Sequence, residues 1–231
     1  VALAEDVHQF NLAALTRTMI APVIPPAAGG DRLLLVVGNA AGLTAAETAH
    51  RSLVESWGYV VELIDDDDDQ AAYDTAVSGN DVVLITNDIT ASSLGTKLSN
   101  ATIGVVTSEC NLSDEFGMAA SIVWESGTDV QLYENNHYIT SPFLIGNLPI
   151  LTSSQSLAYV DGNLSPDLDQ LAKSASGFGI VSLPAGAEAY DAGTIAGRRV
   201  QLPWGGNGFD PNSLTTDGQT ILKRWLERAA G

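Results

Sequence analysis

The sequence has 231 residues, of which 45% are apolar and 16% charged, as is typical of a folded globular protein with a sizeable core. The formal net charge is -18, with 10 Lys and Arg residues against 28 Asp and Glu residues. Phosphate groups would be repelled by this charge. The composition therefore disfavours nucleic acid and anionic membrane surfaces as partners.

The sequence has one cysteine, Cys110, which excludes an intrachain disulfide and a thiolate metal cluster. No apolar run reaches transmembrane length, so we predict no transmembrane segment. The few lysines and the many Ser, Thr, Asn and Gly residues favour an extracellular or cell-surface protein. The Ala2-Leu3-Ala4 stretch has the form of a leader cleavage site, and an alanine-rich helix start explains it equally well.

Residues 1–30 are predicted to form an N-terminal arm. Acidic residues followed late by Arg17 favour a helix over residues 5–21, and three prolines and two glycines in 22–30 favour an extended tether. We expect the arm to pack on its own body or to join copies into a homo-oligomer, because its apolar surface is too large to leave in water. Its predicted interface residues are Val7, Phe10, Leu12, Leu15, Met19 and Ile20.

Residues 31–231 are predicted to form a single α/β domain. The runs "RLLLVVG", "YVVELI", "DVVLIT" and "TIGVVTS" are of strand length and alternate with helical segments, which indicates a parallel sheet with right-handed crossovers. Thr44 and Glu47 form a capping box at the start of the first helix of the body.

The middle of the sequence is less regular. "SIVWES", "DVQLYEN" and "SLAYVDG" alternate in polarity and predict antiparallel or edge strands. "GFGIVSLP" and "GRRVQLPWG" are predicted as late strands of the main sheet. A last helix over about 214–230 carries an apolar stripe.

Five aspartates, Asp65–Asp69, follow the second strand. An acid there contacts a ribose in dinucleotide-binding folds, but "GNAAGLT" after the first strand, with Asn39 and Thr44 as candidate ligand contacts, is neither G-x-G-x-x-G nor a P-loop. A cation site at Asp66 and Asp68 is a second alternative. We favour a third, a helix cap by Asp68 or Asp69, and predict no cofactor.

Cys110 follows the fourth strand, where α/β enzymes often place a nucleophile. His137 is its one plausible base, and Glu109 beside it would raise the thiol pKa. We favour a buried structural cysteine. Carboxylate pairs for glycoside hydrolysis are too common in sequence to single out.

Three segments together resemble ThuA-like proteins: "LLLVVGNAAGLTAAETAHRSLVESWGYVVELIDDDD", "NNHYITSPFLIGNLPILTSSQSLAYVDG" and "AGRRVQLPWGGNGFDPNSLTTDGQTILKRWLERAAG". The resemblance covers about 31–231. It implies the class I glutamine amidotransferase-like superfamily and its fold, a flavodoxin-like three-layer α/β sandwich with a mostly parallel sheet.

The superfamily's catalytic set has no counterpart here. Its nucleophile lies in G-x-C-x-G, whereas Ser108 and Leu112 flank Cys110, and no histidine follows His137 to form its His-x-Glu pair. The resemblance therefore implies the scaffold without the triad. The acidic turn is similar to turns in modules of bacterial secreted surface proteins.

We therefore predict a non-catalytic extracellular module for structure or interaction, self-assembling through its arm into a surface layer or filament. The alternatives are a hydrolase of carbohydrate-like substrates, with its site around Asn39, Glu109, Cys110 and His137, and a small-ligand binding module in the same crevice.

Overall fold

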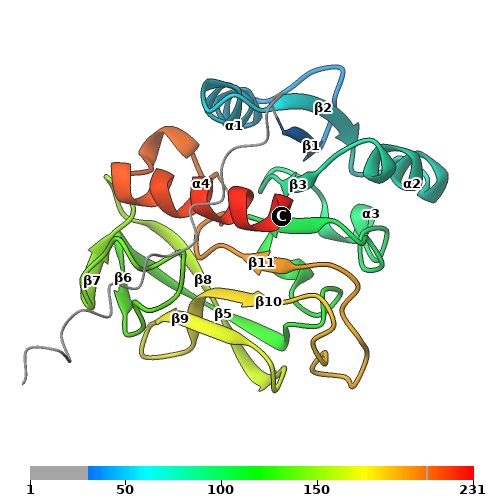
Figure 1. The fold of residues 1–231 in the computed structure, drawn as a ribbon. Helices are drawn as coiled ribbons and strands as arrows, with labels where there is room; N and C mark the ends of the chain where they lie inside the picture. The colour runs from blue at the N-terminus through cyan, green and yellow to red at the C-terminus, as the bar shows by residue number, and fades with distance from the viewer. Residues whose placement is uncertain (1–30, 207) are drawn as a thin grey trace, which may run out of the picture.

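The computed structural model describes residues 31–206 and 208–231. The arm predicted over 1–30, with its helix and its six apolar interface residues, lies outside them. The described residues form eleven β-strands and four α-helices, and all eleven strands belong to one mixed sheet (Figure 1).

One half of the sheet is parallel, in the order β2-β1-β3-β4-β11. The apolar runs predict the first four of these strands correctly. Leu33–Val37 of β1 are all fully buried, with alternate side chains in two separate cores on opposite faces of the sheet. The strands are β1 (Arg32–Val37), β2 (Val60–Asp65), β3 (Val82–Ile85), β4 (Gly104–Thr107) and β11 (Arg199–Gln201).

Helices cover this parallel half. α1 (Ala45–Ser56) and α4 (Thr216–Ala230) pack into the core on one face, and α2 (Gln70–Ser78) and the short α3 (Ala91–Leu94) pack into the core on the other. The predicted Thr44–Glu47 capping box is present at α1. The predicted closing helix is confirmed as α4, which lies across the sheet in Figure 1 and contacts β3, β4 and β7.

The other half of the sheet is antiparallel, continuing from β11 in the order β10-β9-β6-β7. The β5–β8 pair joins it through a pairing of β8 with β10, at Val160 and Phe178. The alternating segments of the sequence are confirmed as antiparallel strands. The bounds are β5 (Ala119–Gly127), β6 (Asp129–Leu132), β7 (Gly146–Pro149), β8 (Gln155–Leu164), β9 (Asp169–Lys173) and β10 (Phe178–Leu183).

The predicted flavodoxin-like sandwich with a mostly parallel sheet is therefore wrong. Parallel neighbours need long crossovers, usually helical. Between β4 and α4 the described residues contain no helix longer than the single turns η2 (Cys110–Leu112) and η3 (Pro211–Ser213). Strands joined without such crossovers pair antiparallel with their neighbours. Six of the eleven strands, β5–β10, therefore form an antiparallel extension of the sheet, which the resemblance to ThuA-like proteins does not imply.

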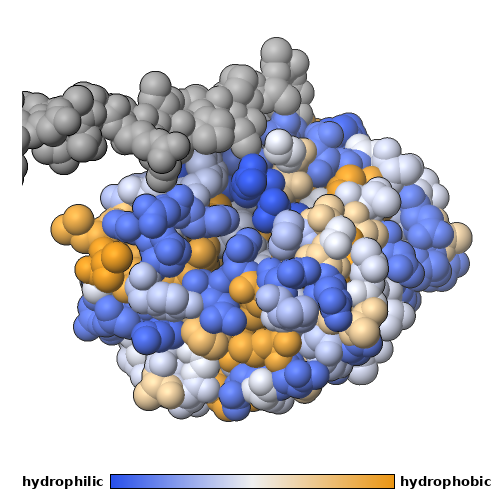
Figure 2. All heavy atoms as spheres, turned by 60° about the horizontal axis from the view of Figure 1, so that its bottom comes forward, coloured by the Kyte–Doolittle hydropathy of each residue, from blue (hydrophilic) through white to orange (hydrophobic). Residues whose placement is uncertain are grey.

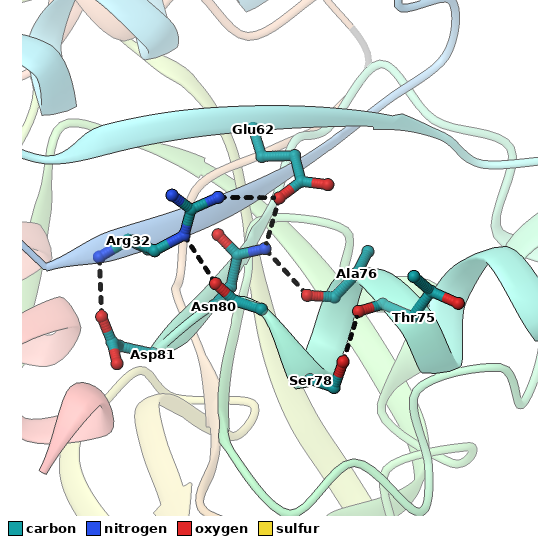
Figure 3. A network of polar contacts seen from close by, with 8 residues as sticks. Arg32, Glu62, Thr75, Ala76, Ser78, Asn80 and Asp81 are labelled. Atoms are coloured by element: carbon teal, nitrogen blue, oxygen red, sulfur yellow. Dashed lines mark hydrogen bonds and ion pairs between the residues drawn. The ribbon is translucent and has the colours of Figure 1, made fainter.

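Two polar clusters hold the amino ends of the parallel strands. Figure 3 shows Arg32 of β1 donating its main-chain N–H to Asp81 at 2.7 Å and its Nη2 to Glu62 of β2 at 3.4 Å, while Asn80 donates to the same Glu62 oxygen at 2.9 Å. Arg32 Nε also donates to the carbonyl of Gly79 at 2.6 Å. These contacts join β1 and β2 to the turn that leads from α2 into β3.

Arg199 of β11 forms the second cluster. Its fully buried guanidinium donates to the carbonyls of Leu98, Ser99, Ala101 and Ile103 at 2.7–3.3 Å. Burial lowers its pKa to about 10, so it stays charged at neutral pH. The carbonyl oxygens take the place of the water that the guanidinium would bind in solution. Through these bonds Arg199 fixes the irregular segment between α3 and β4 to the centre of the sheet.

Candidate functional site at the carboxyl rim

The parallel strands end at one edge, which we call the carboxyl rim. It comprises Gly38–Ala40 after β1, Asp65 at the end of β2 with Asp66–Asp69 after it, Asn87 and Asp88 after β3, Ser108–Cys110 after β4 and Leu202–Gly206 after β11. Open α/β sheets bind ligands at such an edge, where neighbouring strands lead away in opposite directions. Here that point lies between β1 and β3.

The loops after β1 and β3 are fastened to each other. Thr44 Oγ1 donates to Asp88 Oδ2 at 2.6 Å, and the Glu47 carboxylate accepts the N–H groups of Gly38 at 2.7 Å and Thr44 at 2.8 Å. Asn39 is exposed, and its Oδ1 accepts the N–H of Ala41 at 3.0 Å. Asn39 and Thr44 thus lie close in the chain at the switch point, and both side chains already bind protein atoms.

The aspartate run also binds backbone groups. Asp69 is the N-cap of α2 and accepts the N–H of Ala72 at 2.9 Å, which confirms the predicted cap. Asp65 accepts the N–H of Ala40, and the buried Asp66 accepts that of Thr90. Burial raises the pKa of Asp66, and the Thr90 bond offsets part of that rise. The acids therefore tie the second strand end to its neighbours.

The two aspartates considered for a cation serve different backbone groups. Asp66 binds the N–H of Thr90, whereas Asp68 is exposed and accepts the N–H of Asp65 at 3.3 Å. Within 31–206 and 208–231, no three His, Cys, Asp or Glu side chains are grouped so as to hold a metal ion.

Cys110 is completely buried at the rim. Its Sγ lies 3.7 Å from the carbonyl oxygens of Ser108 and Leu202 and 4.0 Å from that of Trp204. Burial, aided by the adjacent Glu109 charge, raises the pKa of the thiol well above its usual value. The surroundings therefore favour the protonated thiol, which donates to carbonyls and is a poor nucleophile.

His137 contacts α4 from the segment that follows β6. It occupies the segment between β6 and β7, with its ring 5.4 Å from that of Trp225 in α4. Burial lowers its pKa, and nearby charges include Asp169, Arg228 and Arg198, the residue before β11. The Nδ1 atom of His137 accepts the N–H of Ile139 at 3.3 Å, whereas the Cys110 thiol binds carbonyl oxygens, so the two predicted partners bind different groups.

Glu109 caps a turn. Its Oε1 accepts the main-chain and side-chain N–H groups of Asn111 at 2.8 and 2.6 Å, at the start of η2. Burial raises the pKa of Glu109, and these hydrogen bonds partly counter the rise. Of the sequence-predicted catalytic residues, Glu109 and Cys110 are thus neighbours at the rim.

A carboxyl pair that the sequence does not single out lies just beyond. Burial, and then the neighbouring Asp114 carboxyl, raise the pKa of Glu115 to about 7. Asp114 also lines a pocket of about 190 Å³ with Cys110, Asn111 and the start of β5. Adjacent acids in "SDEFG" are too common a pattern to reveal this, and only the partial burial in the fold distinguishes the pair.

Comparison of the sequence with models of known protein families gives no match, and neither does comparison with curated proteins. The likeness to ThuA-like proteins stays a prediction from short segments. The role of the chain must therefore be inferred from its own residues.

Proposed function

We propose that the chain is a non-catalytic module of an extracellular or cell-surface structure, and that its copies join through the N-terminal arm. The observation that carries this proposal is the state of Cys110. The only thiol of the sequence is enclosed at the rim and bound to carbonyls, while the imidazole of His137 binds the N–H of Ile139. The rim side chains described above bind backbone groups and side chains of neighbouring loops.

The charge distribution supports a role for the arm in assembly. The arm contains Glu5, Asp6 and Arg17, a formal charge of -1, which leaves -17 of the total -18 on residues 31–231. Two bodies would repel each other at low salt, whereas the nearly neutral, apolar arm can approach an acidic body. None of the helices in the described part of the chain has the length and apolarity to cross a membrane.

A hydrolase of carbohydrate-like substrates is the second candidate, favoured by the carboxyl pair. With a pKa of about 7, Glu115 keeps a protonated fraction at neutral pH, the form in which a carboxyl acts as a general acid, and Asp114 beside it lines a pocket. A Glu115→Gln variant, assayed against a panel of aryl glycosides, tests this. A glycosidase activity that the variant loses would favour the hydrolase over the structural module.

The structural proposal is tested by deleting residues 1–30. Light scattering coupled to size exclusion, with electron micrographs, should show concentration-dependent oligomers or fibres of the full chain and monomers of the deletion variant. Identical monodisperse monomers in both preparations would refute the proposal.

A further inference from the structure

Two adjacent apolar side chains stand out on the surface. Leu144 is 87% exposed and Ile145 is 58% exposed, just before β7. Figure 2 shows hydrophobic spheres gathered at its left-hand end, the side on which Figure 1 places the β6–β7 hairpin, among mostly hydrophilic surface. An exposed apolar patch bordered by polar residues is a candidate for a surface that another chain covers.

The segment that presents the patch is firmly attached to α4. Arg224 Nε donates to the carbonyl of Tyr138 at 2.8 Å, and its guanidinium lies 3.8 Å from the centre of the Tyr138 ring. Tyr138 Oη donates to Glu227 at 2.8 Å, and Arg224 Nη2 donates to Ser141 at 3.1 Å. The neighbouring Phe143 is buried in the core. Leu144 and Ile145 are therefore held out by an anchored loop.

We propose that Leu144 and Ile145 form the acceptor on which the arm of a neighbouring copy docks, through the apolar residues of its 1–30 segment. This inference rests on the proposed function and names the surface that the arm binds. Burial of apolar area on both sides would drive the contact.

Three properties of the chain favour this occupant. The arm has six large apolar side chains that need cover, namely Val7, Phe10, Leu12, Leu15, Met19 and Ile20. Its charge of -1 allows approach to a body of charge -17, which a second body would oppose. Nine residues, 22–30, lie between the apolar residues of the arm and the body, and a chain of that length can span at most about 30 Å, enough to reach a neighbour.

The contact would be heterologous, because the arm and the acceptor are different surfaces of the same chain. Such contacts repeat from copy to copy and form a ring where the rotation closes or a fibre where it does not.

The first test substitutes the patch in the full chain. Leu144→Ser together with Ile145→Ser should raise the dissociation constant of self-association by at least about tenfold, as loss of two central apolar contacts does. The matched control is Val60→Ser, 52% exposed on β2, which forms the end of the sheet opposite β7. It should change the constant less than about twofold. The single Leu144→Ser variant is a milder form, and thermal melts verify that each variant folds.

The second test adds the arm in trans. A fluorescent peptide of residues 1–30 should bind the 31–231 body, and the Leu144→Ser, Ile145→Ser body should lose this binding. If arm deletion abolishes assembly while the patch variant assembles and binds peptide normally, the inference fails and the proposed function stands. If full chain and deletion variant are both monomers, the proposed function fails. A full-chain monomer that shields its own patch, and so binds peptide only after arm deletion, overturns docking between copies.

Discussion

His50 makes the stability of the fold depend on pH between about 6.5 and 4. It lies on α1, fully buried, with its ring 6.0 Å from that of Phe209. Burial lowers its pKa from 6.5 to about 4, against smaller opposing effects of the Ala46 carbonyl and Asp210. The unfolded chain therefore binds a proton at a pH where the folded chain does not. The stabilisation is complete above pH 6.5 and is lost as the pH falls.

The size of the effect follows from the two pKa values. Each pKa unit corresponds to about 1.4 kcal/mol, so the shift of His50 lowers the free energy of unfolding by about 2 kcal/mol at pH 5 and by roughly 3 kcal/mol at pH 4. Below pH 4 the folded protein also takes up the proton, and this contribution stops growing.

Urea unfolding at pH 7, 5 and 4 measures this contribution when the wild type is compared with His50→Leu. The substitution replaces the titrating imidazole with an apolar side chain of similar size. Other acids titrate in both proteins, so the difference between the two free energies of unfolding isolates His50. That difference should shift in favour of the variant by about 2 kcal/mol from pH 7 to 5. Parallel stability curves over this range would refute the role assigned to the buried ring.

Three further predictions concern bonds at the rim and in the sheet. Cys110 should resist a thiol reagent at neutral pH and react once urea unfolds the chain; prompt modification of the folded protein would contradict its burial. Thr44→Ala should lower the free energy of unfolding by about 1–2 kcal/mol, whereas Thr90→Ala should change it little, because Thr90 makes no side-chain cap; equal losses would be inconsistent with the cap. Arg199→Met should lower the free energy of unfolding by about 3 kcal/mol, because it leaves buried carbonyl groups without a donor. Thermal or urea melts measure this, and an unchanged stability would count against the role of that cluster.

Local features of the fold are predictable from the sequence. The runs that form β1, β3 and β4 are apolar over strand length, and a strand buried on both faces needs little else. Thr44 and Asp69 are helix caps that bind the N–H of a residue three positions later. Such caps depend only on a few neighbouring residues, so the local sequence predicts them.

The antiparallel half of the sheet is not predictable in this way. Whether β10 pairs parallel or antiparallel with β11 depends on how the chain travels between them, a property of distant residues. A short apolar run such as that in β10 has the same pattern in both cases.

The candidate site depends still more on tertiary structure. Cys110 and His137 are a plausible pair by residue type, but in the fold the thiol binds the carbonyl of Leu202 and the imidazole binds the N–H of Ile139. "FLIG" does not reveal which side chains are covered. Phe143 enters the core while Leu144 and Ile145 point outward, because Arg224 of α4 fixes the preceding residues.

The guanidinium of Arg199 has a consequence for how the protein meets different surroundings. Its ligands are neutral carbonyls, which neither acid nor added salt can discharge or compete away as they would a surface carboxylate. Carboxylates on the surface are screened by salt and titrate with pH. The guanidinium at the centre of the sheet keeps its charge and its carbonyl partners. The chain thus combines an acidic exterior whose charge varies with pH and a guanidinium in β11 whose charge does not.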